Sequence, residues 1–240
     1  MASGQQQDLF FLELNDLEDR VHGLARRLIS KPVRKILWES LQLLNDHHHE
    51  AYKGELRVTL IAEQMARFLD QDPKYAVIGG LAHDIGKKDI PLDTLRKSYS
   101  RRYGPWLTSD METMMAHPYL GYDYLMKQSQ NTRLSDSDRA DVVAGAWIAE
   151  TSHQRQRNFY PEKLPSPPKE LVDSGLLEIV NSSGLIVTLA DQYEACYRDN
   201  PKFGGPLDHD RAKKEMIGFT SDETTHLLIE RLFDEEKGIL

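Results

Sequence analysis

Apolar residues recur at the spacing of an α-helix along most of this chain. No segment shows the strict alternation of apolar and polar residues that a half-buried strand would need. In residues 50–69, for example, one helical face would carry Leu56, Leu60, Ile61, Met65, Phe68 and Leu69. Elements of this kind bury their apolar faces only against one another, so the pattern predicts an all-α fold.

Local signals predict where several helices begin. A capping residue followed by proline or by an acidic residue is typical of a helix start. Such signals stand at Ser30 with Pro32, at Asp72-Pro73, at Ser109 with Glu112, at Ser135, and at Ser221 with Asp222. We further expect residues 171–198 to be helical with an interruption near residues 181–184.

Composition excludes several classes of protein. Thirty basic and 38 acidic residues give a net charge of −8, which disfavours nucleic acid as a partner. No apolar run approaches the ~18 residues of a membrane-spanning helix, so we expect no membrane association. The first twenty residues lack the features of a secretory signal. A single cysteine, Cys196, excludes an internal disulfide framework and, with the missing signal, predicts a cytoplasmic protein.

The segment LAHDIGK, residues 81–87, carries the strongest chemical signal. The imidazole of His83 and the carboxylate of Asp84 together suit a divalent cation such as Fe, Mn or Zn, and two carboxylate oxygens can bridge two cations. Gly86 allows a turn or a close backbone approach, and Lys87 offers a compact positive charge for a phosphate oxygen. Taken alone, a His-Asp pair is also typical of a polar helix end.

Three segments in order give this signal a context. They are HDIGKKDIP at 83–91, LTSDMETMMAHPYLGYDYL at 107–125 and LADQYEACYRDNP at 189–201. Together they resemble the HD superfamily of metal-dependent phosphohydrolases, most closely its HD-GYP type, over roughly residues 47–235. The resemblance implies a helical bundle that encloses a metal site. It also implies hydrolysis of phosphoester bonds, which in HD-GYP members are those of cyclic dinucleotides.

The resemblance also implies a set of metal ligands. These are His83, Asp84, His117, His153 and Asp191, with Asp84 as the bridge and, together with Lys87, as a catalytic residue. The cofactor would be a divalent ion (Fe, Mn, Zn, Ni or Co); one is expected and a second is left open. The family's earlier histidine is replaced by Gly54. Glu50 lies one helical turn before it, about 40° away on the same face, and is the candidate to replace that ligand.

Two further segments depart from the family pattern. In residues 151–161, Ser152 and Gln154 stand where the family has a histidine and a glutamate, so a second cation would be held more weakly. Asn200 stands where the family has a phosphate-contacting arginine. The candidates for substrate binding are therefore Lys87, Arg155, Arg198 and Lys202.

Other roles stay open for single residues. His117 could simply end a helix, His153 could bond within its loop, and Asp191 could be held by a salt bridge. The run His47-His48-His49 is interpreted as a solvated helix start rather than a metal cluster, because these side chains point in different directions around a helix.

The sequence therefore predicts a metal-dependent phosphohydrolase or phosphodiesterase that acts on a nucleotide or cyclic dinucleotide. The alternative is a degenerate HD domain that senses a ligand or contacts a partner protein. Neither the substrate nor the oligomeric state can be read from the sequence, and a homo-oligomer is possible. We expect residues 1–45 to form a helical segment that packs on one domain, residues 46–240. The proline-rich loop at 156–170 is not taken as a linker between two domains, because the helices on its two sides carry complementary parts of a single site.

Overall fold

The all-α fold is confirmed by the computed structural model, which describes residues 8–154, 156, 160–198, 200–220, 222–234 and 239. Within these ranges every regular element is a helix. The α-helices are α2 (Leu14–Leu28), α3 (Lys31–His47), α4 (His49–Phe68), α5 (Lys74–Gly80), α6 (Leu92–Tyr99), α7 (Thr108–Met114), α8 (His117–Ser129), α9 (Asp136–Thr151), α10 (Lys169–Asp173), α11 (Leu177–Tyr197), α12 (His209–Phe219) and α13 (Glu223–Leu232). Three short 3-10 helices are η1 (Asp8–Phe11), η2 (Ile85–Asp89) and η3 (Arg101–Tyr103).

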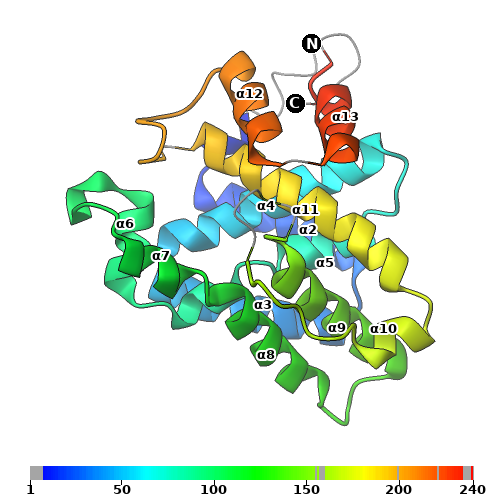
Figure 1. Cartoon of the computed structure of the whole chain (residues 1–240). Coiled ribbons are helices and arrows are strands. Elements are labelled where there is room, and N and C mark those ends of the chain that lie inside the picture. Colours follow the sequence, from blue (N-terminus) through cyan, green and yellow to red (C-terminus); the bar gives the residue numbers. More distant parts are fainter. Residues whose placement is uncertain are drawn as a thin grey trace.

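The two longest helices, α4 and α11, pack against each other in the middle of the molecule (Figure 1). Helix α5 packs on both, α9 packs on α5 and α11, and α8 lies along α9. The core between them contains fully buried apolar side chains such as Ile61, Met65, Ile148 and Val187. Burying such a side chain contributes about 1.5–3 kcal/mol, which holds these central helices in fixed relative positions.

The first two α-helices cover one side of this centre. Helix α2 contacts α3, α4 and α5, and α3 contacts α4, α9 and η2. Helix α3 continues to His47, two residues beyond the expected boundary at residue 45. The division into a segment 1–45 and a domain 46–240 stays a prediction.

Several expected helix starts are confirmed. Ser30 precedes α3, which has Pro32 in its first turn, and α5 begins directly after Asp72-Pro73. Ser135 caps α9, since its hydroxyl accepts a hydrogen bond from the Asp138 backbone N–H at 3.1 Å. Asp222 caps α13 through the backbone N–H of Thr224, whereas Ser221 lies outside the described residues.

Two expectations were wrong. Helix α7 begins at Thr108, so Ser109 is not its capping residue; instead the Asp110 carboxylate accepts a hydrogen bond from the Leu107 N–H at 2.9 Å. Helix α11 runs without interruption through residues 181–184, and the break falls earlier, between α10 and α11, where Gly175 has a φ of 69°. Glycine adopts that backbone conformation without steric cost, and this makes it the natural end of α10.

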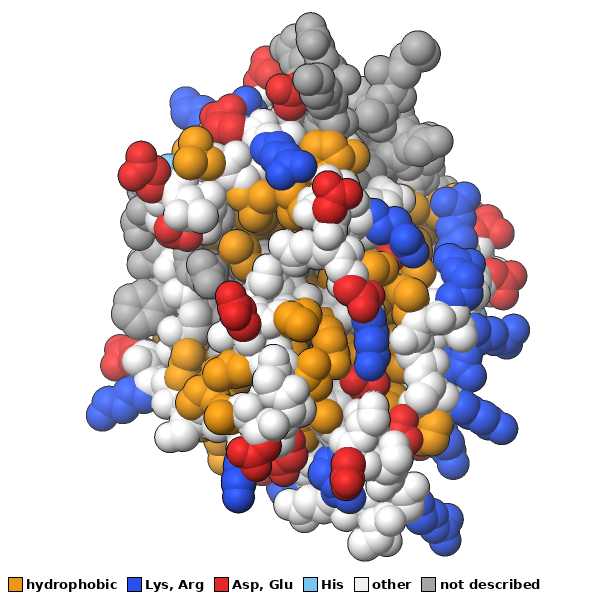
Figure 2. All heavy atoms as spheres, turned by 90° about the vertical axis from the view of Figure 1, so that its right-hand side faces the viewer, with side chains coloured by type: hydrophobic (Ala, Val, Ile, Leu, Met, Phe, Trp, Pro, Cys, Tyr) orange, Lys and Arg blue, Asp and Glu red, His pale blue; other side chains and the backbone are white. Residues whose placement is uncertain are grey.

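The surface mixes charges of both signs. On the face shown in Figure 2, acidic and basic side chains alternate around hydrophobic ones, and basic side chains gather along one edge of the view. In the part of the chain that the structure describes, no helix combines the length and apolarity needed to cross a bilayer.

Candidate metal centre

Two of the motif segments are held together by direct backbone contact. Helix α5 ends at Gly80, the chain turns through His83 and Asp84, and η2 begins at Ile85. A Cβ atom on Gly86 would lie 2.0 Å from the carbonyl oxygen of His117 and 2.5 Å from the backbone nitrogen of Gly121. Only glycine fits there without a backbone shift. This contact places the start of α8, with His117, beside Asp84.

A first group of polar atoms surrounds Nε2 of His83. This nitrogen lies 3.6 Å from Oδ2 of Asp84 and 3.7 Å from Oδ1 of Asp191, which comes from α11. His83 is 1% exposed, and its Nε2 has no hydrogen-bond partner within the described ranges. A buried imidazole nitrogen without a partner is costly unless something else binds it.

Glu55, which the sequence analysis did not identify, lies behind His83. Its Oε2 is 2.9 Å from Nδ1 of His83, and the Gly80 carbonyl oxygen is 3.3 Å from the same nitrogen. Two acceptors at Nδ1 hold a ring proton there, so Nε2, which faces Asp84 and Asp191, is the nitrogen that would give up its proton to a cation. A carboxylate behind a ligating imidazole is a common second layer in metal sites. The signal in the sequence is an acidic residue inside α4, directly before the apolar positions Leu56, Leu60 and Ile61.

A second group forms on the other oxygen of Asp84. Its Oδ1 lies 3.0 Å from Nε2 of His117, which in turn lies 3.0 Å from Nε2 of His153. Nδ1 of His117 donates to the Met114 carbonyl at 2.7 Å, so its Nε2 presents a lone pair. All three ligand candidates are at least 94% buried, and the His153 ring stacks on Tyr160 at 4.5 Å. One atom from each of the three lies within 4.8 Å of the others.

Lys87 lies beside the bridge between the two groups. Its ammonium contacts Oδ2 of Asp84, and its side chain is 14% exposed. Burial alone would raise the pKa of Asp84. The charges of Lys87 and His83 lower it by more, so this pKa lies well below its ordinary value. Burial lowers the pKa of Lys87, but Asp84 and then Tyr99 have the larger combined effect and raise it. Both groups are therefore charged near neutral pH.

The remaining groups respond to burial and to each other. Burial, reinforced by the neighbouring His117, lowers the pKa of His153 to about 3. Burial would lower the pKa of His83, yet the carboxylate of Glu55 raises it above its ordinary value. Burial raises the pKa of Glu55 to about 7 against the opposing effect of His83. Burial would also raise the pKa of Asp191, but the neighbouring His83 imidazole lowers it. Neutral His153 is thus in the form that binds cations.

The structure does not bring Glu50 to either group. Its carboxylate is 56% exposed and lies 3.9 Å from the ammonium of Lys53 on the same helix. The three neighbouring histidines are likewise outside the groups. His47 bonds to the Ile90 carbonyl at 2.7 Å, the His48 side chain caps α4, and His49 is exposed beside Asn45.

An ion pair occupies the space near Gly54. A Cβ atom on Gly54 would lie 3.7 Å from Oε1 of Glu194, and that oxygen accepts hydrogen bonds from Nε and Nη2 of Arg57 at 3.0 and 2.6 Å. The other oxygen, Oε2, lies 3.2 Å from Nε of Arg198, whose guanidinium stacks on Tyr99 at 4.3 Å. Glu50 therefore does not replace the family's missing histidine. The position of that histidine, Gly54, instead lies beside a buried salt bridge.

The loop after α9 does not supply the two lost family ligands. The Ser152 hydroxyl donates to the Ala149 carbonyl at 3.1 Å, and the Gln154 amide donates to the Pro161 carbonyl. Arg155, a predicted substrate contact, lies outside the described residues. The loop residue that contacts the second group is Gln156, whose amide Nε2 lies 2.6 Å from Nδ1 of His153.

A cavity of about 280 Å³, called here the inner pocket, reaches the first group. It is lined by Met111, Tyr160, Asp191, Gln192, Ala195, Cys196, Arg198, Asn200, Lys202, Phe203, Glu215, Met216 and Phe219. Two buried polar atoms at its wall, Oε1 of Gln192 and Nη1 of Arg198, have no hydrogen-bond partner among the residues that the structure describes. The inner pocket thus connects Asp191 of the first group with charged side chains of both signs (Arg198, Lys202 and Glu215) and with apolar ones.

Comparison with known proteins agrees with this geometry. A model of the HD domain family matches residues 52–196, which include the first group, the second group and Glu55. None of the curated proteins compared with the chain matches it. Since the family match covers more than half of the chain, the protein belongs to the HD domain family.

Proposed function

We propose that this HD-domain protein is a metal-dependent hydrolase that cleaves a phosphoester of a nucleotide or cyclic dinucleotide. The observation that carries the proposal is the position of Asp84 between two groups. Its Oδ2 faces His83, and its Oδ1 lies 3.0 Å from Nε2 of His117. A carboxylate placed between two sets of nitrogen ligands suits cation binding on either oxygen.

The residues fit a divalent cation. His83 Nε2 and Asp84 Oδ1 are buried without hydrogen-bond partners in the described ranges, and the Nε2 atoms of His117 and His153 face each other at 3.0 Å. The Gln156 amide donates to Nδ1 of His153, so the neutral His153 ring carries its proton on Nε2 and shares it with His117; a cation bound there would replace this proton. Imidazole and carboxylate ligands accept Fe, Mn, Zn, Ni or Co, with His83, Asp84 and Asp191 holding one ion and Asp84, His117 and His153 a second.

A bound cation would lower the pKa of a coordinated water and offset charge on the phosphoryl oxygens. The protein's own cations support the same role. Lys87 is an ammonium paired with Asp84 at the candidate metal groups, and Arg198 lines the inner pocket. Lys202 lines the same pocket further out. We propose these three as the contacts to substrate phosphates, since Arg and Lys neutralise such oxygens effectively.

The HD-GYP-like type remains part of this proposal. The segments around Gly86 and Gly121 have the residue spacing of the HD-GYP type. Their backbones are in direct contact between η2 and α8. The Ser152 hydroxyl and Gln154 amide, however, are bound to backbone carbonyls. This observation favours the second candidate function, an HD domain with a weakened second ion site that binds a phosphorylated ligand as a regulator without hydrolysing it.

Metal analysis followed by a turnover assay tests the proposal. Protein purified without chelators should contain a divalent metal, and with added manganese it should hydrolyse bis-p-nitrophenyl phosphate and a nucleotide phosphoester. Asp84→Ala should lose both metal and turnover. Asp141→Asn, a buried carboxylate paired with Lys74 outside the site, is the matched control and should retain both. Full metal content in folded Asp84→Ala would refute the site, and metal without turnover on either substrate would favour the regulator.

A further inference from the structure

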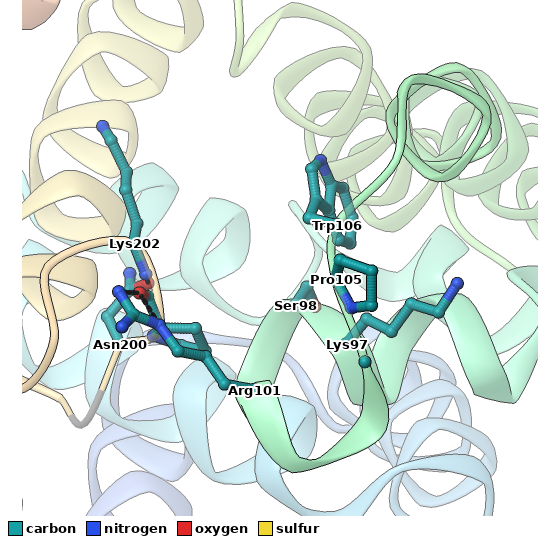
Figure 3. A pocket seen from close by; sticks show the side chains of 9 residues that line it. Lys97, Ser98, Arg101, Pro105, Trp106, Asn200 and Lys202 are labelled. Atoms are coloured by element: carbon teal, nitrogen blue, oxygen red, sulfur yellow. Dashed lines mark hydrogen bonds between the residues drawn. The ribbon is translucent and has the colours of Figure 1, made fainter.

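A second cavity lies next to the inner pocket. This outer pocket has a volume of about 690 Å³, within the range of small-molecule sites (about 300–1,000 Å³). It is lined by Lys97, Ser98, Arg101, Gly104, Pro105, Trp106, Asn200, Pro201 and Lys202. In Figure 3, Pro105 and Trp106 stand on one side of the opening, and Asn200, Arg101 and Lys202 on the other.

The two pockets share part of their lining. Asn200 and Lys202 belong to both, and the inner pocket extends from them to Asp191 of the first metal group. A molecule with its phosphoester at the metal centre and a substituent directed past Asn200 would therefore enter the outer pocket.

Of the three cationic side chains that line the outer pocket, one is paired with a carboxylate in the described part of the chain. Lys97 contacts both oxygens of Asp110 at 3.0 Å, and the Arg101 guanidinium donates to the Pro201 carbonyl. Lys202 pairs with no carboxylate in the described part of the chain; its ammonium lies over the rings of Phe203 and Phe219. The outer pocket therefore holds two cations without a carboxylate partner among the described residues, Arg101 and Lys202, and Lys202 lies where it meets the inner pocket.

Trp106 gives the outer pocket an aromatic wall. It is 41% exposed and makes no ring contact within the described ranges. Pro105 beside it is equally a flat apolar surface. A scattered exposed tryptophan needs no explanation, but one that lines a cavity connected to a metal group offers a stacking surface for a planar ring.

We propose that the outer pocket binds the planar ring of the substrate's alcohol substituent against Trp106, so that the substrate class is a nucleotide rather than a sugar or alkyl phosphate. The proposal rests on the proposed function in that the phosphoester lies at the metal groups. Stacking on an aromatic side chain recognises any base, so the pocket selects for a ring and not for one nucleobase.

Calorimetric titration of the whole, metal-containing protein with AMP and with ribose 5-phosphate tests this assignment, with phosphate release measured in the same solutions. The two probes differ only in the base. We expect AMP to bind at least about tenfold more tightly, equivalent to ~1.4 kcal/mol. Trp106→Ala should reduce that ratio to below about twofold, and Trp106→Phe should restore most of it.

Two more variants separate stacking from charge and from general damage. Lys202→Met should weaken both probes by a similar factor and leave their ratio unchanged. Leu107→Ala, at an exposed neighbouring position that does not line the outer pocket, should change neither the binding of the two probes nor their ratio. Equal binding of the two probes, or an unchanged ratio in folded Trp106→Ala, would overturn the assignment even if phosphoesters are hydrolysed. Ring-dependent binding in protein that contains no metal and hydrolyses neither bis-p-nitrophenyl phosphate nor a nucleotide phosphoester would support the outer pocket and refute the proposed function instead.

Discussion

Glu55 and His83 form a buried pair in which Oε2 of the glutamate lies 2.9 Å from Nδ1 of the imidazole. The pair holds a ring proton on Nδ1, and it aims the other nitrogen at Asp84 and Asp191. Because the contact lies on the side of the ring away from these carboxylates, Glu55 acts through His83 as a positioning residue. Its effect on the site should exceed that of any exposed carboxylate on the same helix.

Glu55→Gln should therefore weaken metal binding by about tenfold to a hundredfold, the usual cost of losing such a partner. The amide keeps the shape of the side chain but removes the charge that supports His83. Competition with a chromophoric chelator measures the affinity, and Glu50→Gln on the exposed face of α4 is the control, with no expected change. A larger loss in Glu50→Gln than in Glu55→Gln would instead make Glu50 a ligand, as the sequence alone predicted.

Gly86→Ala should destabilise the fold by at least about 3 kcal/mol, or prevent folding, because the added Cβ would lie 2.0 Å from the His117 carbonyl oxygen. Urea unfolding gives the free-energy difference. Gly23→Ala, in the middle of α2 with nothing within 4 Å of the new Cβ, should instead stabilise by up to about 1 kcal/mol. Comparable stability of the two variants would mean that η2 and α8 are not in contact.

His153→Ala should reduce the amount of metal bound more than it reduces stability. The residue belongs only to the second group, so an ion held by His83, Asp84 and Asp191 should persist while one equivalent is lost. Elemental analysis after dialysis measures the stoichiometry. His49→Ala, an exposed histidine bonded to Asn45, serves as the control. If His153→Ala retained the wild-type stoichiometry, its ring would be a loop residue that packs on Tyr160.

Glu150→Gln should change how stability depends on pH. Burial raises the pKa of Glu150 from 4.5 to about 7, and its Oε2 has no hydrogen-bond partner among the described residues. The folded chain holds this proton more tightly than the unfolded chain, so the associated stability is full below pH 4.5 and is lost as the pH rises through about 7. The variant should thus be more stable than wild type at pH 8 by roughly 1–3 kcal/mol, with little gain at pH 5.

Urea unfolding at the two pH values measures this difference. Glu178→Gln, an exposed glutamate in the first turn of α11, should leave the pH dependence unchanged. Parallel pH profiles for wild type and Glu150→Gln would show that Glu150 is ionised in the folded protein across this range.

The sequence predicted those parts of the structure that depend on local chemistry. Helix starts at Ser135 and Asp222 follow from side chains that bond to the next backbone N–H groups, and this requires no tertiary information. The break in residues 171–198 was predicted too late, near residues 181–184, where Gly184 is a residue that often interrupts a helix. In the structure Gly184 lies within α11, and Gly175, with its positive φ, marks the actual end of α10.

Some residues of the candidate site could likewise be predicted from the sequence, and others could not. His83, Asp84, His117 and Asp191 could be identified from short motifs, and the structure brings them within 4 Å of a neighbour in the same set. Glu55 could not be found by asking which residue shares a helical face with Gly54, because adjacent positions point about 100° apart. What fills the space beside Gly54 is Glu194, which comes from a helix 140 residues further along the chain and which only the packing of α4 on α11 reveals.

Helix α11 carries Asp191 at the candidate metal centre and Gln192 and Cys196 in the wall of the inner pocket, and Glu194 joins the same helix to Arg57 of α4 through an ion pair. Its backbone is continuous over this stretch, so these side chains share one rigid body. Any tilt of α11 that widened the cavity for a bulkier guest would also withdraw Asp191 from His83. The width of the inner pocket and the affinity for a cation are thereby linked. A ligand that fits the pocket poorly would lose contacts in the pocket and would also weaken cation binding at Asp191.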